Sequence, residues 1–121
     1  MPRVLLTCGD AALCETLRRS FQAQGFVVCG EATIGIQAIK KAMELLPNLV
    51  ILEKELSPLD GFEIAEALKL ILPDVPLFLV AEEHDVEVEK EALSHGIDAV
   101  FDKDHDFTSL VMNARAVCGL E

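Results

Sequence analysis

Residues 49–61, LVILEKELSPLDG, decide how the rest of the chain is interpreted. Four apolar residues run without a break into the carboxylate of Glu53, and a Ser-Pro-Leu-Asp-Gly turn follows. An unbroken run of Leu, Val and Ile is typical of a strand buried on both faces of a parallel sheet. Functional groups in such sheets lie just past the carboxyl ends of the strands, so Glu53 is a candidate functional residue. The alternative is an acid in water at the end of a strand.

The bulk composition is that of one folded, acidic domain. The chain has 121 residues, of which 51% are apolar. These values indicate a single domain over residues 1–121 and exclude a disordered acidic tail. Acids outnumber bases by 21 to 10, and the net charge is −11. We therefore expect no nucleic-acid partner and no anionic membrane surface, because both require clustered Lys and Arg.

Signals for export, membrane insertion and zinc binding are missing from the sequence. Residues 7–10 interrupt the first apolar run too early for a signal peptide, and no apolar run approaches the roughly 20 residues of a membrane span. The cysteines have no CxxC spacing, so we expect no zinc site and expect buried thiols. They are Cys8, Cys14, Cys29 and Cys118. These features predict a protein of the reducing cytoplasm.

Five apolar segments alternate with helical segments along the chain. The predicted strands cover residues 4–7, 26–29, 49–52, 76–81 and 98–101. The first, second and fifth helices are predicted to begin at the N-cap residues Asp10, Thr33 and Asp106. The third helix is expected to follow Asp60-Gly61. Residues 82–91 lead into a poorly amphipathic fourth helix that stops at Gly96. Gly25 is expected to close the first helix in a left-handed conformation.

Apolar residues at helical spacing predict which helix faces are buried. These residues are Leu13, Leu17 and Phe21 in the first helix, Ile36, Ile39, Met43 and Leu46 in the second, Ile64, Leu68 and Ile71 in the third, and Leu110, Ala114 and Val117 in the last. Strand and helix alternating five times predict an α/β fold. We expect a single doubly wound, flavodoxin-like domain, with a five-stranded parallel sheet and five helices on both faces.

The alternation, the turn after Glu53 and a Lys just past the fifth strand make the chain similar to the receiver domain of bacterial response regulators. The resemblance runs from Arg3 to about Cys118, essentially the whole chain. Two segments carry most of it. The stretch from Gly30–Gly35 through Pro47–Leu52 looks like the family's second helix and third strand, and residues 54–61 look like the loop after the phosphoacceptor.

The resemblance implies a small metal-dependent phosphotransfer device. In the family, two acids after the first strand and an acceptor Asp after the third hold one Mg²⁺. The metal and a Lys after the fifth strand neutralise the phosphoryl oxygens. A Ser or Thr at the end of the fourth strand binds the phosphoryl group, and an aromatic residue on the fifth strand responds to it.

Most of these positions are substituted in this chain. Carried over without a gap, the positions are Cys8 and Gly9 for the acid pair, Glu53 for the acceptor, Ala81 for the hydroxyl residue, Val100 for the aromatic and Lys103 for the Lys. Only Lys103 keeps the family's residue type. Glu53 alone is too little to anchor Mg²⁺, and its extra methylene moves its oxygen by about an ångström. We therefore expect a pseudo-receiver without a cofactor, enzymatic activity or phosphate acceptance.

A one-residue slip in the first turn leaves an alternative open. Asp10 then takes the place of the second acid, and the domain becomes an atypical phosphoacceptor that uses Asp10 and Glu53 and binds Mg²⁺ there. In the register without a gap, Asp10 is only a helix cap. A third interpretation is a flavodoxin-like domain that binds a small molecule, but no GxGxxG or P-loop follows any strand. His84, His95 and His105 are not spaced as a metal triad.

Glu53 and Lys103 are expected to face each other across the strand ends. We predict an ion pair between them, where the family places its aspartyl phosphate and Lys, and we expect this pair to hold the loop in one arrangement. An exposed pair contributes only about 0–1 kcal/mol. The alternative is that the two side chains share a solvated rim without contact.

The partners that the resemblance implies are proteins. They are a histidine kinase, an effector domain or a second receiver, bound through the face of the fourth helix, fifth strand and fifth helix. In this chain the region begins with a run of acids, Glu82, Glu83, Asp85, Glu87, Glu89 and Glu91. The run is either a solubilising charged surface or an acidic docking surface for a basic partner, whose binding would weaken in salt.

Overall fold

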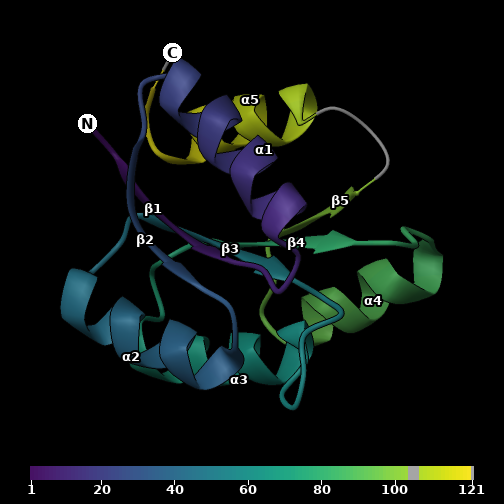
Figure 1. Cartoon of the computed structure of the whole chain (residues 1–121). Coiled ribbons are helices and arrows are strands. Elements are labelled where there is room, and N and C mark those ends of the chain that lie inside the picture. The colour runs from purple at the N-terminus through teal and green to yellow at the C-terminus, as the bar shows by residue number, and fades with distance from the viewer. Residues whose placement is uncertain (104–106, 121) are drawn as a thin grey trace.

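Within residues 1–103 and 107–120, the part of the chain that the computed structural model describes, five parallel strands form one sheet (Figure 1). The strands are β1 (Arg3–Thr7), β2 (Val27–Ala32), β3 (Leu49–Glu53), β4 (Leu77–Ala81) and β5 (Ala99–Asp102). Their order across the sheet is β2-β1-β3-β4-β5. The predicted doubly wound α/β fold is confirmed. The predicted cap residue Asp106 lies outside the described residues.

Five helices in the described residues cover the two faces of the sheet (Figure 1). Two lie together on one face, α1 (Ala11–Ala23) and α5 (Thr108–Val117). Three lie on the other face, α2 (Gly35–Leu45), α3 (Gly61–Ile71) and α4 (Val86–Ser94). Each layer has its own apolar core against the sheet. None of the described helices has the length and apolar character needed to cross a lipid bilayer.

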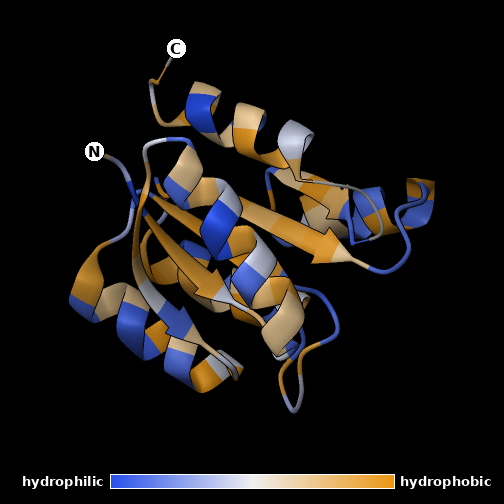
Figure 2. Ribbon diagram, turned by 45° about the horizontal axis from the view of Figure 1, so that its top comes forward, coloured by the Kyte–Doolittle hydropathy of each residue, from blue (hydrophilic) through white to orange (hydrophobic). Residues whose placement is uncertain are grey.

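β3 and β4 are buried along their whole length. β3 lies between β1 and β4, and helices cover both faces of the sheet, so its side chains do not reach water. Figure 2 shows the strands as mostly hydrophobic and the hydrophilic residues on helices and loops. This burial on both faces explains why residues 49–52 are apolar without alternation. Glu53, the last residue of β3, pairs with Val80 of β4.

β2 is longer than the predicted strand over residues 26–29. It begins at Val27 and continues to Ala32. Its last three residues pair with Leu5–Thr7 of β1, beyond an irregularity in the register. The apolar run therefore marks only the first half of this strand, because the second half is more polar.

The strand order opens a crevice at one edge of the sheet. β1 lies between β2 and β3, so the chain leaves β1 toward one side of the sheet and later returns on the other. The loops after β1 and β3 diverge at this point, which is where α/β sheets place their functional groups. Thr7 of β1 pairs with Leu52 of β3. Residues 8–10 therefore lie beside Glu53.

Several helix ends follow the sequence-based predictions. Asp10 caps α1 with its side chain. Gly25 follows α1 with a φ of +87°, in the left-handed region that favours glycine. Asp60 and Glu63 form a capping box at the start of α3.

The cap predicted for α2 is wrong. Ile34 occupies the N-cap position without a side-chain hydrogen bond. The backbone N–H and the hydroxyl of Thr33 both donate to Oε1 of Gln37 instead. The helix thus begins one residue later than the hydroxyl residue that marks it in the sequence.

The buried stripe predicted for α2 is also wrong. Three of its four large residues are more than half exposed, namely Ile36, Met43 and Leu46, and only Ile39 packs against the core. The helix buries small residues instead, Gly35, Ala38 and Ala42. A Cβ at Gly35 would lie only 2.7 Å from Ile64 Cγ1. Small residues therefore allow α2 to approach α3 closely, and the larger side chains are left on the outer face.

Two further residues predicted to be buried, Ile71 and Val117, are 38% and 51% exposed. Each is the last residue of its helix. The next residue, Leu72 or Cys118, packs against the core in its place. The remaining inward positions of α1, α3 and α5 are buried as predicted.

Gly61, the first residue of α3, is packed too closely for a side chain. A Cβ there would lie 2.8 Å from Leu79 Cδ1 and 2.9 Å from the carbonyl oxygen of Glu53. We expect Gly61→Ala to lower the free energy of unfolding by about 1–3 kcal/mol, because the backbone must shift. This loss occurs although alanine is the better helix former.

Urea denaturation followed by circular dichroism measures this loss. Gly9→Ala is the matched control, because the nearest atom to its Cβ would be 3.6 Å away, an ordinary contact distance. Equal stability losses in the two variants would contradict the packing argument.

Candidate functional site

Glu53 is a buried carboxylate with both oxygens bound. It is 5% exposed. Its Oε1 accepts hydrogen bonds from the backbone N–H groups of Gly9 at 2.8 Å and Asp10 at 3.3 Å. Its Oε2 accepts a hydrogen bond from Lys103 Nζ. The interpretation of Glu53 as an acid in water is therefore wrong.

Lys103 contacts carboxylates from two loops. Its Nζ binds Glu53, lies 2.8 Å from Glu55 Oε1 and 4.0 Å from Glu82 Oε1. The Lys103 side chain is 14% exposed, and its backbone N–H donates to the carbonyl oxygen of Ala81 at 3.1 Å. The predicted ion pair between Glu53 and Lys103 is present, and the alternative of a solvated rim without contact is wrong.

The pKa of Lys103 reflects two opposing effects. Burial of the ammonium acts to lower it, but the hydrogen bonds to Glu53 and Glu55 outweigh burial. The pKa of Lys103 is therefore raised above its usual value. The ammonium of Lys103, just after β5, therefore binds two carboxylates at the carboxyl end of β3, those of Glu53 and Glu55.

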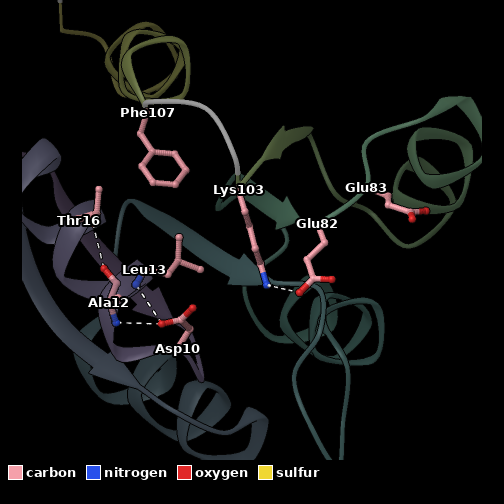
Figure 3. Close-up of a pocket in the computed structure, with 8 residues that line it drawn as sticks. All are labelled: Asp10, Ala12, Leu13, Thr16, Glu82, Glu83, Lys103 and Phe107. Atoms are coloured by element: carbon pink, nitrogen blue, oxygen red, sulfur yellow. Dashed lines mark hydrogen bonds and ion pairs between the residues drawn. The ribbon is translucent and has the colours of Figure 1, made fainter.

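A cleft of about 670 Å³ opens beside this cluster. In Figure 3, Lys103 reaches toward Glu82 on one side, and Asp10 lies on the side of α1. The cleft is lined by Asp10, Ala12, Leu13, Thr16, Glu82, Glu83, Lys103 and Phe107. The charged residues that line the cleft are three acids, Asp10, Glu82 and Glu83, and one cation, Lys103.

Of the three residues that follow β1, only Asp10 brings a carboxylate to this cleft. Cys8 is 1% exposed and belongs to the core beneath α1 and α5. Gly9 has no side chain. Asp10 borders the cleft, but its Oδ1 accepts hydrogen bonds from the N–H groups of Ala12 at 2.9 Å and Leu13 at 3.3 Å (Figure 3). Its side chain therefore caps α1, as the register without a gap predicts.

These side chains do not fit a Mg²⁺ site. Mg²⁺ takes oxygen ligands in near-octahedral geometry. Both oxygens of Glu53 are hydrogen-bonded, and Cys8 could supply only a thiol. Among the described residues, no group of three or more His, Cys, Asp or Glu side chains could hold a metal ion. An ion here would have to draw Glu53 away from Lys103 and would share the Asp10 carboxylate with the cap of α1.

The positions of the family's hydroxyl and aromatic residues carry small apolar side chains. Ala81 is fully buried at the end of β4, and Val100 is 8% exposed on β5. Both belong to the core beneath α2, α3 and α4. The neighbouring Phe101 packs on the opposite face, with its ring centroid 5.3 Å from that of Phe78. Ala81 therefore supplies no hydroxyl, and Val100 supplies no aromatic ring.

Sequence reasoning missed Glu55 and the backbone N–H groups of residues 9 and 10. Glu55 lies two residues after Glu53, and a second acid so close to a strand end was the available signal. The N–H groups carry no signal, because almost every residue supplies one. Their role depends on the turn after β1, which is visible only in the folded chain.

The histidines described by the structure lie at separate places. His84 Nε2 is 2.9 Å from Glu89 Oε1. His95 Nδ1 is 2.6 Å from Glu66 Oε1, and its ring stacks on Phe62. His105 lies outside the described residues. His84 and His95 therefore each pair with a carboxylate of a neighbouring surface segment.

Comparisons with known proteins point to one family. A family model described as the response regulator receiver domain matches residues 4–115. The transcriptional regulatory protein PrrA of Mycobacterium tuberculosis is 28% identical over 116 residues, which cover 96% of this chain and 49% of PrrA. The response regulator MprA of Mycobacterium ulcerans is 27% identical over 115 residues, with 95% and 49% covered. The chain spans about half the length of these curated relatives.

Solved structures of receiver domains share the fold. The response regulator domain of CheB from Thermotoga maritima has a TM-score of 0.88 at 22% identity, with 100% of this chain and 98% of that chain covered. A structure described as the beryllofluoride-activated DrrB receiver domain has a TM-score of 0.87 at 18% identity, with 98% of each chain covered. At these identities the likeness concerns the fold alone.

Removal of the Lys103 cation should destabilise the fold, because it leaves Glu53 buried without a counter-charge. We expect Lys103→Met to lower the free energy of unfolding by about 2–4 kcal/mol in urea denaturation. Lys90→Met is the matched control, since Lys90 is exposed on α4, and it should change stability by less than about 0.5 kcal/mol. Adding Glu53→Gln to Lys103→Met should restore part of the loss. A double variant less stable than Lys103→Met would count against a buried ion pair.

The same variant has an expected pH dependence. A Lys whose folded pKa exceeds the unfolded value of about 10.4 stabilises the fold fully below that value. The contribution is lost as the pH rises through the folded pKa. The stability difference between the wild-type protein and Lys103→Met should therefore be constant up to about pH 9 and shrink above about pH 10.4. A difference that grows in alkaline solution would be the opposite of this expectation.

Proposed function

The chain belongs to the response regulator receiver domain family, and we propose that it acts in two-component signalling as a receiver that does not accept phosphate and works by binding proteins. The observation that carries this proposal is the state of the Glu53 carboxylate. It is buried at the acceptor position, and both of its oxygens are already bound by N–H donors.

The first argument concerns Glu53 as a nucleophile. An acceptor oxygen must reach the phosphorus atom in line with the leaving group. Glu53 Oε1 is held by the N–H groups of residues 9 and 10, and Oε2 is held by Lys103. Attack by either oxygen would weaken at least one of these hydrogen bonds in a buried place, where an unpaired charge is costly.

The second argument concerns charge neutralisation during phosphoryl transfer. The family relies on a metal ion and a Lys for this task. The side chains after β1 do not fit Mg²⁺, because Cys8 and Gly9 bear no carboxylate and Asp10 caps α1. Lys103 is engaged by the carboxylates of Glu53 and Glu55. No cation in this cluster is thus left uncommitted for an incoming phosphoryl group.

The third argument concerns hydrogen-bond donors. Ala81 has only a methyl group where the family has a hydroxyl, and it is fully buried. A phosphoryl group on Glu53 would lack that donor. The proposed receiver therefore keeps one arrangement of its loops, set by Glu53 and Lys103, and any change of state would come from a bound partner.

An atypical phosphoacceptor that uses Asp10 and Glu53 is the alternative. One observation favours it, because Asp10, Glu53, Glu55 and Lys103 all border a single pocket at the strand ends. In this alternative, Asp10 turns its carboxylate toward the metal, and a full loss of its cap on α1 would cost about 1 kcal/mol. Glu53 must also leave Lys103. The two functions differ in whether Mg²⁺ binds, so one experiment separates them.

The experiment is an amide NMR titration of the full chain with millimolar Mg²⁺ and then with beryllofluoride, a mimic of the phosphoryl group. We expect the resonances of Asp10, Glu53 and Lys103 to stay in place. The DrrB receiver domain, whose solved structure is described as beryllofluoride-activated, is the positive control. The triple variant Cys8→Asp, Gly9→Asp and Glu53→Asp should gain Mg²⁺-dependent shifts. Shifts at Asp10 and Glu53 in the wild-type protein would support the phosphoacceptor instead.

The protein partner is proposed to be a histidine kinase, an effector domain or a second receiver, bound at the face of α4, β5 and α5. Three of the six acids there have structural contacts. Asp85 caps α4 by accepting from the N–H of Val88 at 2.9 Å, Glu89 contacts His84, and Glu82 Oε1 lies 4.0 Å from Lys103 Nζ. The other three are exposed and can meet a basic surface, namely Glu83, Glu87 and Glu91. Binding of a kinase or effector domain should weaken as salt rises, and an affinity independent of salt would exclude an acidic docking surface.

A further inference from the structure

The outer face of α2 exposes three large apolar side chains, those of Ile36, Met43 and Leu46. Ile36 and Met43 are seven positions apart, on the same side of the helix, and Leu46 follows Met43 by three positions. α2 packs on its own domain through small residues instead. Single exposed apolar residues are normal on a protein, but a group of them on one helix face is typical of a contact surface.

Leu46 occupies a backbone position that suits a glycine. It is the C-cap of α2, with a φ of +48°, and its N–H donates to the carbonyl oxygen of Ala42 at 3.0 Å. Glycine adopts this left-handed conformation more readily than leucine. The exposed side chain contributes little packing within its own domain to offset the strain. A large apolar side chain at this position is therefore suited to contact with another surface.

Two side chains of opposite charge lie on the same face. Lys40 and Glu44 are exposed and about one turn apart. Among the described residues, neither has an ion-pair partner. Lys before Glu is also the weaker order for an ion pair within one helix. The face therefore has no net charge, and each of its two charges can meet one of opposite sign.

We propose that this α2 face, formed by Ile36, Lys40, Met43, Glu44 and Leu46, binds the same face of a second copy of the chain. Lys40 and Glu44 lie two positions on either side of Ala42. Two antiparallel copies of α2, related by a two-fold axis at the level of Ala42, therefore bring Lys40 of each copy opposite Glu44 of the other. The same axis brings the two Met43 side chains together at the centre, with Ile36 of each copy near Leu46 of the other.

The distribution of charge favours a second copy as the occupant. A face with one cation and one anion matches its own copy, whereas a partner of a single sign would meet one like charge. The whole chain carries a net charge of −11, and a run of acids lies on and before α4. α2 and α4 occupy opposite ends of their layer, with α3 between them (Figure 1). Two copies joined through α2 thus keep these acidic segments apart.

The contact is small, so we expect a weak dimer. Standard interfaces bury about 800 Å² on each partner, and one face of an 11-residue helix offers less. We expect a dissociation constant between about 10 µM and 1 mM. The α2 face is separate from the face of α4, β5 and α5 proposed above for other proteins. Either proposal can therefore fail without the other.

Charge reversal tests the proposed pairing, with sedimentation velocity of the full chain up to about 1 mM as the measurement. Lys40→Glu alone and Glu44→Lys alone should each weaken the dimer about tenfold or more, because like charges then face each other. An equimolar mixture of the two variants should form a heterodimer, since every charge on one variant meets an opposite charge on the other. Lys90→Glu on α4 is the matched control, because it changes the net charge equally, and it should leave the dimer unchanged.

Apolar variants test the centre of the contact. Met43→Gln should weaken the dimer about tenfold or more. Met112→Gln on α5 is the matched control, since Met112 is 55% exposed and Met43 56%, and it should have no effect. Leu46→Gly should weaken the dimer while the urea midpoint of unfolding stays the same or rises, because glycine relieves the left-handed backbone.

Three results would overturn the proposal. One is a chain that stays monomeric at about 1 mM, which would leave the α2 face to a different protein or to none. Another is a dimer that Lys90→Glu weakens as much as Lys40→Glu does, or a mixture of the two charge variants that stays monomeric. The third is a dimer whose dilution shifts the amide resonances of α4, β5 and α5 rather than those of α2.

Discussion

The burial of the Glu53 carboxylate constrains the loops at the carboxyl ends of the central strands. A charge at this depth costs several kcal/mol unless hydrogen bonds and a counter-charge compensate it. The turn after β1 supplies two N–H groups, and Lys103 after β5 supplies the cation. Each segment is therefore held in place by the need to satisfy one side chain. The loops at the carboxyl ends of β1, β3 and β5 are thus connected through Glu53.

The same arrangement places Glu53 where the family resemblance locates phosphoryl binding. The resemblance assigns phosphoryl binding to the groups around the acceptor, and here a carboxylate with one more methylene lies among them. Glu53 reaches the N–H groups on one side and Lys103 on the other without any added ligand. The substitutions at Cys8, Gly9 and Ala81 are consistent with this, because a carboxylate bound in this way needs neither metal ligands nor a further hydroxyl donor.

The sheet could be predicted from sequence because its central strands are buried on both faces. Residues 49–52 have no alternation to misinterpret, and the following acid marks the strand end. The ion pair of Glu53 and Lys103 was also predictable, since parallel strands bring their carboxyl ends to one edge. The degree of burial of Glu53 was not, because it depends on N–H groups that any sequence supplies. The buried face of α2 was not predictable either, for a different reason. Its inward face is made of Gly35, Ala38 and Ala42, which weigh little in a hydrophobic pattern but permit close packing on α3.

Glu53 meets Gly9 across 44 positions of the chain and Lys103 across 50. Contacts of this span require large loops to close, so they form only once β1, β3 and β5 have come together. Until then the carboxylate remains in water and the ammonium is free. An interaction absent from the folding transition state slows unfolding without speeding folding. We therefore expect the Glu53 cluster to act mainly on the lifetime of the folded domain.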